Sequence, residues 1–262
     1  MAREISIYLK LTKMHIRSGL EYRGWWMMVI YVTVGLAADL FAIVLMFLRF
    51  GGVGEWSMER ILLVYMLAST SYGLAKIICV GLEDFPWEIQ SGSLDRMLLR
   101  PCSLLLQIIG SRFRLRRVPW AITGVAAIIW LWVRLGIPFG FFNLVVLVFA
   151  LLGGFLLYTG VFVMTSGIAF FTVKGLDWIY LLTSGARQVT RCPIDYLPKV
   201  LWGTFTFVMP VMVVSYYPAA LVCGWGEPAF AGLLALPVGM LFFWISLFVW
   251  KIGLRHYKST GS

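Results

Sequence analysis

Side chains that could carry catalytic or metal chemistry are few and far apart in this sequence. The two histidines, His15 and His256, stand near opposite ends of the chain, and neither belongs to an HExxH or GxSxG pattern. The four cysteines form no CxxC pair, so they predict neither a zinc site nor a disulfide framework. No Gly-Lys dipeptide occurs, which excludes a phosphate-binding GxxxxGKS/T loop. The sequence therefore predicts no catalytic site, no metal site and no cofactor held by this chain.

A mixed apolar and charged segment, residues 83–117, is the most informative stretch for binding. Leu94 and Leu98 share one helical face, while Asp95 and Arg96 supply charge. A short helix of this kind suits docking to a soluble partner protein. Lying on lipid headgroups is the alternative, and composition does not separate the two.

Polar residues inside long apolar stretches are costly in lipid, so they mark either a translocation path or contacts between helices. Tyr65, Ser69, Tyr72 and Lys76 recur at helical spacing and form one face. Helix packing is slightly favoured for this stripe. A second hydroxyl stripe, further along the chain, is a weaker candidate for a substrate-facing surface. The candidate path residues are Asp39, Tyr65, Ser69, Tyr72, Tyr158 and Thr165.

Asp39 and Lys76 are charged residues inside the first and second predicted spans. At 1.5 Å of rise per residue, their positions along the two spans differ in depth by more than about 10 Å. A direct ion pair is therefore not expected. Lys76 is predicted to extend toward the cytoplasm, and Asp39 to face a dimer interior or a wet cavity.

Glycine and proline predict how particular helices pack and bend. Gly153, Gly160 and Gly167 repeat every seven residues, which indicates close helix packing. Pro210 removes a backbone donor within a span and is predicted to bend it. Pro218 is predicted to end that helix near the outer surface. Both prolines are candidate gating positions, although a static kink is favoured.

Composition indicates that membrane-spanning helices position these residues. Of 262 residues, 61% are hydrophobic and 13% are charged, and the mean hydropathy is +0.88. Soluble domains hold about 45–50% apolar and about 25% charged residues. Apolar runs of roughly 20 residues cross a bilayer and predict an all-α integral membrane protein with one domain. Its six predicted spans cover residues 25–48, 61–82, 118–137, 141–173, 200–223 and 229–250.

Basic residues predict the orientation of the chain. Eighteen Lys and Arg residues fall on one side of the predicted spans and three on the other, which places both termini in the cytoplasm. The net charge of +10 is therefore a membrane-orientation signal rather than a sign of nucleic-acid binding. Residues 1–24 are predicted to form an amphipathic helix in the cytoplasmic interface with membrane lipid. Residues 176–199 predict a second interfacial helix, with Arg187 and Arg191 pointing outward.

Three stretches carry a resemblance to a known family. Residues 88–101 read EIQSGSLDRMLLRP, residues 207–219 read FVMPVMVVSYYPA, and residues 253–261 read GLRHYKSTG. In this order they resemble the permease subunits of bacterial type-2 ATP-binding-cassette (ABC) exporters. Gln90 departs from the pattern, because a basic residue is expected at that position.

The resemblance implies a permease of the bacterial inner membrane that pairs with a second permease half, identical or related. It also implies separate ATPase subunits, which use ATP and Mg and bind a coupling helix between spans two and three. The residues that it implies for ATPase coupling are Glu88, Ile89, Gly92, Leu94, Asp95, Arg96, Leu98, Leu99, Arg100 and Pro101.

Two other function classes compare poorly with the residues. A membrane-embedded enzyme lacks its catalytic groups, as described above. A channel or a structural membrane subunit without ATP coupling lacks a repeated pore-forming motif, but composition leaves it open. The sequence does not indicate which substrate is transported.

Overall fold

The computed structural model describes residues 25–50, 56–100, 102–111, 118–172, 177–226 and 228–257. These residues form helices joined by turns, with no β-strand among them, so the all-α prediction is confirmed. The amphipathic helix predicted over residues 1–24 lies outside the described residues.

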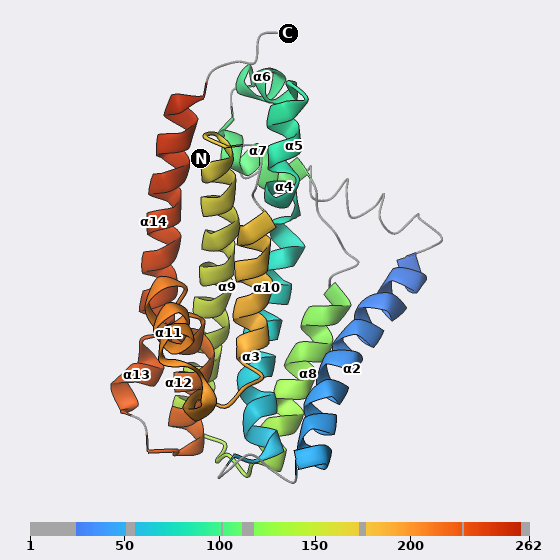
Figure 1. The fold of residues 1–262 in the computed structure, drawn as a ribbon, viewed down its shortest axis with the longest axis vertical. Helices are drawn as coiled ribbons and strands as arrows, with labels where there is room; N and C mark the ends of the chain where they lie inside the picture. The colour runs from blue at the N-terminus through green and yellow to red at the C-terminus, as the bar shows by residue number, and fades with distance from the viewer. Residues whose placement is uncertain are drawn as a thin grey trace.

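Within these ranges, four helices are long and apolar enough to cross a membrane. They are α2 (Trp25–Phe50), α3 (Met58–Ile78), α9 (Phe141–Ala169) and α14 (Ala235–His256). A fifth helix, α8 (Val118–Arg134), is apolar but shorter. Figure 1 shows these helices running along the long axis of the molecule. Each predicted span contains helix, and the count of six spans stays a prediction.

The predicted span over residues 200–223 is broken rather than kinked. It consists of α11 (Lys199–Gly203), the π-helical turn η3 (Thr204–Val208) and α12 (Val211–Cys223). The two halves are bent by 96°. The break falls at Pro210, which has no backbone N–H to continue the helix. The predicted bend at Pro210 is therefore confirmed, and it is a break between two helices rather than a kink in one continuous helix.

The segment before this break takes a course that the sequence did not predict. Helix α10 (Asp177–Val189) lies alongside α3 and α9 (Figure 1). The chain then continues through η2 (Ile194–Tyr196), where the Asp195 carboxylate accepts a hydrogen bond of 2.7 Å from Trp56 Nε1. Trp56 precedes α3, so the segment reaches that end of the bundle instead of lying across the other end. This course differs from the predicted interfacial helix.

Smaller boundary differences occur at the other predicted spans. Helix α3 ends at Ile78, and a separate short helix, α4 (Val80–Glu83), follows it. Helix α9 ends at Ala169, before the predicted end at residue 173. A short helix, α13 (Ala229–Leu233), precedes α14, which continues beyond residue 250.

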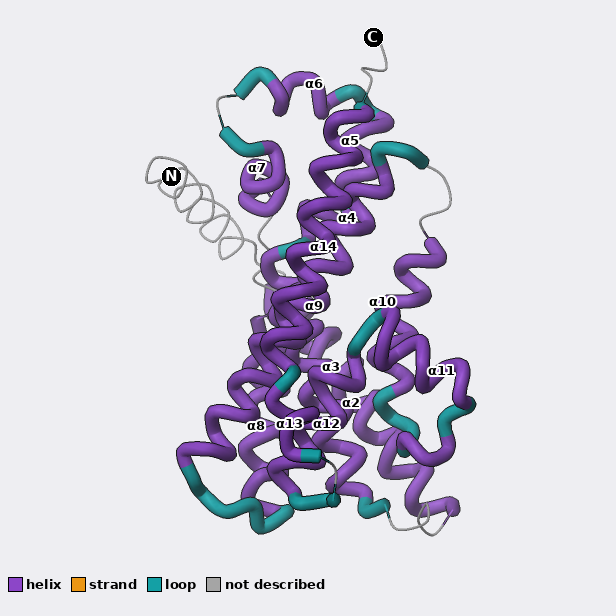
Figure 2. The backbone as a smooth tube through the Cα atoms, turned by 90° about the vertical axis from the view of Figure 1, so that its left-hand side faces the viewer, coloured by secondary structure: helices purple, strands orange, loops and turns teal. Residues whose placement is uncertain are grey.

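Three short helices lie toward one end of the bundle, beside the end of α14 (Figures 1 and 2). They are α5 (Phe85–Gln90), α6 (Ser93–Leu98) and α7 (Leu104–Ser111). We call this end the α6 end. The turn between α8 and α9 lies at the opposite end.

Helix α3 forms the centre of the bundle and contacts α8, α9 and α12. Of an apolar stretch of 18 residues in α3, 83% is buried, whereas the corresponding share for α2 is 12%. Helix α2 therefore lies at the periphery, where it packs against α3 and α8.

Helices α9 and α14 pack backbone to backbone. A Cβ atom at Gly153 would lie 2.2 Å from the backbone oxygen of Ala235, and one at Gly239 would lie 2.2 Å from that of Gly153. Gly160 and Gly167 meet the α14 backbone in the same way. The close packing predicted from the seven-residue glycine repeat is confirmed. A matching repeat on α14, which the sequence reading missed, consists of Gly239, Ser246 and Gly253.

Candidate functional site

The predicted coupling segment forms a helical hairpin of α5 and α6. Gly92 makes the turn with a φ of 69°, a left-handed conformation that glycine adopts without strain. Ser93 Oγ donates to the backbone oxygen of Glu88 at 3.2 Å and also to its carboxylate. The carboxylate of Glu88, a residue predicted to contact an ATPase, therefore accepts a hydrogen bond that helps to close the turn.

The hairpin has an inner face and an outer face. Ile89 and Leu94 are buried, and the Asp95 carboxylate accepts a hydrogen bond of 3.1 Å from the Tyr257 hydroxyl. Burial raises the pKa of the Tyr257 phenol, and its hydrogen bond to Asp95 raises it further. The inner positions therefore pack within the fold, and the coupling role that the resemblance implies for Ile89, Leu94 and Asp95 stays a prediction.

The outer face combines apolar and basic side chains. Trp87, Leu98 and Leu99 are exposed, and 86% of Leu99 is accessible. Arg96 and Arg100 are exposed beside them. Four of the predicted coupling residues thus share an accessible surface, which we call the hairpin surface. It consists of Trp87, Arg96, Leu98, Leu99 and Arg100. Pro101 lies outside the described residues.

The hairpin is joined to the end of the α9–α14 pair. Ser166 Oγ donates to the backbone oxygen of Leu82 at 2.9 Å. The Phe85 ring lies 5.1 Å from the ring of Phe170 and 5.2 Å from that of Trp250, measured between centroids. Packed aromatic rings therefore connect the hairpin to the ends of α9 and α14.

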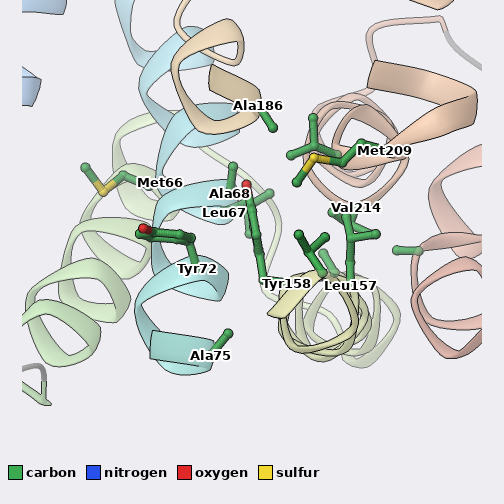
Figure 3. Close-up of a cluster of buried hydrophobic side chains, with 14 of the residues drawn as sticks. Met66, Leu67, Ala68, Tyr72, Ala75, Leu157, Tyr158, Ala186, Met209 and Val214 are labelled. Atoms are coloured by element: carbon green, nitrogen blue, oxygen red, sulfur yellow. The ribbon is translucent and has the colours of Figure 1, made fainter. Parts of the chain in front are cut away.

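The polar stripe of α3 is buried and faces neighbouring helices. Ser69 accepts a hydrogen bond of 3.2 Å from Trp120 Nε1 of α8. The rings of Tyr72 and Tyr158 meet edge to face at 5.3 Å, inside the buried cluster of Figure 3. Lys76 is buried and forms an ion pair with Glu83. A nearby carboxylate therefore stabilises its charge within the fold, and the extension of Lys76 toward the cytoplasm stays a prediction.

Asp39 of α2 joins two arginines from the α10 region. Its carboxylate lies 3.3 Å from Nη1 of Arg187 and forms a closer ion pair with Arg191. The Tyr65 hydroxyl donates to Asp39 at 2.6 Å and accepts from Arg191 at 3.2 Å. We call these residues the charge cluster. The prediction that the two arginines point outward is wrong, because Asp39 and aromatic rings offer them partners within the bundle.

The sequence of this chain matches a known protein family. A family model described as an ABC-2 family transporter protein matches residues 33–261. The chain belongs to this family. Searches of curated proteins and of solved structures return no match. The resemblance predicted from the sequence is thereby confirmed.

Membership of the ABC-2 transporter family assigns a coarse role to the chain. It is a membrane subunit of an ABC transporter, with a transport role rather than a catalytic one. The family match spans the hairpin and the charge cluster. Among the described residues, no group of three His, Cys, Asp or Glu side chains is placed to hold a metal ion.

Two candidate path residues of this ABC-2 protein lie on α9, one of them fully buried and the other half-buried. Tyr158 is completely buried, as Figure 3 shows, and its hydroxyl has no hydrogen-bond partner within the described ranges. Thr165 donates to the backbone oxygen of Val161 at 2.7 Å on its own helix. Tyr158 is thus closed off from solvent in this conformation, whereas Thr165 is half-buried.

The two candidate gating prolines occupy different environments. Pro210 stands at the 96° break before α12. Pro218 is buried inside α12, which continues to Cys223 and ends at Gly224 with a φ of 67°. The prediction that Pro218 ends the helix is wrong, since its neighbours in the bundle stabilise α12 across the missing hydrogen bond.

Proposed function

We propose that this chain is the membrane-spanning permease subunit of an ABC exporter, in which the hairpin surface docks into separate ATPase subunits. The chain would form part of the substrate path, and the partner subunits would bind ATP and Mg. A second permease half, identical or related, would complete the path. We propose the bacterial inner membrane as the location, with both termini and the α6 end in the cytoplasm.

The main support for docking is the composition and position of the hairpin surface. Three large apolar side chains and two arginines are exposed on α5, on α6 and in the turn that follows α6, at one end of the bundle. Exposed apolar patches with a polar rim are typical of protein interfaces. The rigid inner face of the same hairpin supports this role, because a docking element must hold its shape while it transmits force.

Charge distribution supports the proposed orientation. Arg187 and Arg191 lie in the charge cluster and no longer count as residues of a cytoplasmic loop. The remaining Lys and Arg residues of the predicted cytoplasmic segments still outnumber those at Arg49, Arg60 and Arg134. This excess agrees with the positive-inside rule.

Movement of the ATPases would bias the bundle between two conformations. The contacts of Phe85 and Ser166 link the hairpin to α9 and α14. We propose that these two helices move as one unit and that the α12 region, with its break at Pro210, accommodates the movement. The enclosed Tyr158 would then become accessible only in another conformation.

The direct test is co-purification of the chain in detergent with the ATPase encoded beside it. Leu99→Glu places a charge at the most exposed apolar position of the hairpin surface. We expect this variant to lose stable association and the ATP hydrolysis that depends on it, by about tenfold or more.

Phe139→Glu is the matched control. Phe139 is also an exposed apolar residue, at 82% accessibility, but it lies in the turn between α8 and α9 at the opposite end. It should keep full association. If Leu99→Glu binds the ATPase as well as the wild type, docking through the hairpin is wrong, and a channel-like or structural subunit becomes the better account.

A further inference from the structure

The charge cluster carries more positive than negative charge. Arg187 and Arg191 both pair with the single carboxylate of Asp39. Only 11% and 20% of the two arginine side chains are accessible, so water screens them poorly. Within the described part of the chain, these pairs leave one positive charge without a balancing carboxylate. Such a charge is costly in a bundle surrounded by lipid.

The two guanidinium groups also keep unused hydrogen-bond donors. The Nε atoms of Arg187 and Arg191 are both buried, and neither has a hydrogen-bond partner in the described structure. Buried polar atoms are satisfied in the large majority of cases, and charged donors are the most costly to leave unpaired. An oxyanion with several acceptor oxygens matches this donor set, because guanidinium groups bind carboxylate and phosphate through paired N–H bonds.

Aromatic rings hold the two guanidinium groups in place. The Arg187 guanidinium carbon lies 5.4 Å from the centroid of the Tyr72 ring and 5.2 Å from that of Trp120. The Arg191 carbon lies 4.9 Å from the Tyr65 ring. Cation–π contacts occupy the faces of a guanidinium and leave its N–H edges available. The arginines are therefore positioned for an anion before one arrives.

We propose that Arg187 and Arg191 form a binding site for the carboxylate or phosphate group of an organic anion. Asp39 occupies this site in the present conformation, and the ligand would compete with it. That the anion is the transported substrate rests on the proposed permease function. The binding itself does not depend on ATPase docking.

Displacement of Asp39 has a structural consequence. Asp39 belongs to α2, which is the least buried of the long helices. Its ion pairs with the α10 region are contacts that an anion can replace one for one. Ligand binding would therefore loosen α2 from α3 and open the bundle on that side, while the glycine-packed α9–α14 pair stays closed.

The experiment measures equilibrium binding of labelled dodecyl phosphate to the full chain, purified alone in an uncharged detergent. Unlabelled dodecanol, which has the same tail without the phosphate, is the neutral competitor. We expect saturable binding that dodecyl phosphate competes for and dodecanol does not. Equal competition by dodecanol would overturn the proposal, because recognition would then lie in the tail alone.

Three variants make the test specific. Arg191→Gln leaves Arg187 and Asp39 as a balanced pair, and it should weaken binding about tenfold through loss of a charge-assisted contact. Asp39→Asn removes the competing carboxylate and should strengthen binding about tenfold. Arg134→Gln removes an exposed arginine that stacks on Trp130 and should leave binding unchanged. Identical affinity in the wild type, Arg191→Gln and Asp39→Asn would refute the site.

Two further competitors separate the possible sources of the anion. Displacement of dodecyl phosphate by inorganic phosphate would support a soluble anion as ligand. Displacement only by phosphatidylglycerol in mixed micelles, and not by phosphatidylcholine, would support an anionic lipid headgroup. Displacement by phosphatidylcholine and phosphatidylglycerol alike would count against recognition of net negative charge and would overturn the proposal.

Discussion

Helices α9 and α2 lie in the same bundle but are attached to it by opposite means. Helix α9 meets α14 through glycines whose missing side chains let the two backbones touch. Helix α2 is mostly exposed; it buries Leu36 and Ile43, and its Asp39 pairs with two arginines. Backbone packing is geometrically fixed, whereas an ion pair can be exchanged for another.

This difference assigns separate roles to the two regions. The α9–α14 pair continues into the hairpin through Phe85 and Phe170, so it is suited to transmit movement as a rigid body. Helix α2 is suited to separate from the bundle when its ion pairs are replaced. A permease needs both properties, because one part must carry force and another must open.

The largest expected difference in stability comes from adding one methyl group to α9 and, in a separate variant, one to α2. Gly153→Ala would place a Cβ 2.2 Å from the Ala235 backbone oxygen and should destabilise the protein by about 3 kcal/mol. Gly35→Ala in α2 meets nothing within 4 Å and should stabilise it by about 0.5 kcal/mol through helix propensity. Thermal unfolding in detergent measures both. Equal effects of the two substitutions would contradict the contrast between a packed and a loose helix.

A smaller effect is expected from breaking the attachment of α2. Asp39→Asn leaves two arginines without a carboxylate and should cost about 2 kcal/mol, less than for a fully buried pair because the side chains keep some water contact. Hydrogen exchange should increase in α2 and not in α9. Arg49→Gln, an exposed change on the same helix, is the control and should have no effect. Faster exchange in α9 after Asp39→Asn would show that the two regions are not independent.

The sequence predicted features that one helix carries by itself. The glycine repeat on α9 predicted close packing because three positions on one face suffice to define it. A short helix between the second and third spans was predicted from a continuous motif, whereas the hairpin of two helices and its turn at Gly92 were not. Which side of α6 faces outward was not predictable, since a helix of six residues gives no strong periodicity and Leu94 and Leu98 share a face by spacing alone.

Features that depend on distant pairing were missed. Asp39 and Arg187 are separated by 148 positions in the chain. Arg187 was placed outside the membrane because its segment is too short and too polar to be recognised as a span. Its partners become visible only when α10 is placed beside α3. The matching repeat of Gly239, Ser246 and Gly253 was a signal available in the sequence that could have identified α14 as the partner of α9.

The smallest effect is expected at the contact between the hairpin and α14. Tyr257→Phe removes the hydrogen bond to Asp95 and should cost less than about 1 kcal/mol. Because the folded-state pKa of Tyr257 is raised above its ordinary value of 10.0, this stabilisation is fully present below that pH. It is lost as the pH rises through the raised pKa. The free energy of unfolding, measured against pH, should fall at high pH in the wild type. Tyr257→Phe should lack this fall, whereas the exposed control Tyr196→Phe should keep it.

The most direct test of ATPase docking is a photo-crosslink from Leu99 in native membranes. A photoreactive amino acid replaces Leu99 in one variant and Phe139 in a second variant of the same chain. After irradiation, mass spectrometry identifies whatever is attached at each position. We predict an adduct with an ATP-binding-cassette ATPase from position 99 and none from position 139. Adducts from position 99 that contain only lipid would contradict the proposal that the hairpin surface is the docking site.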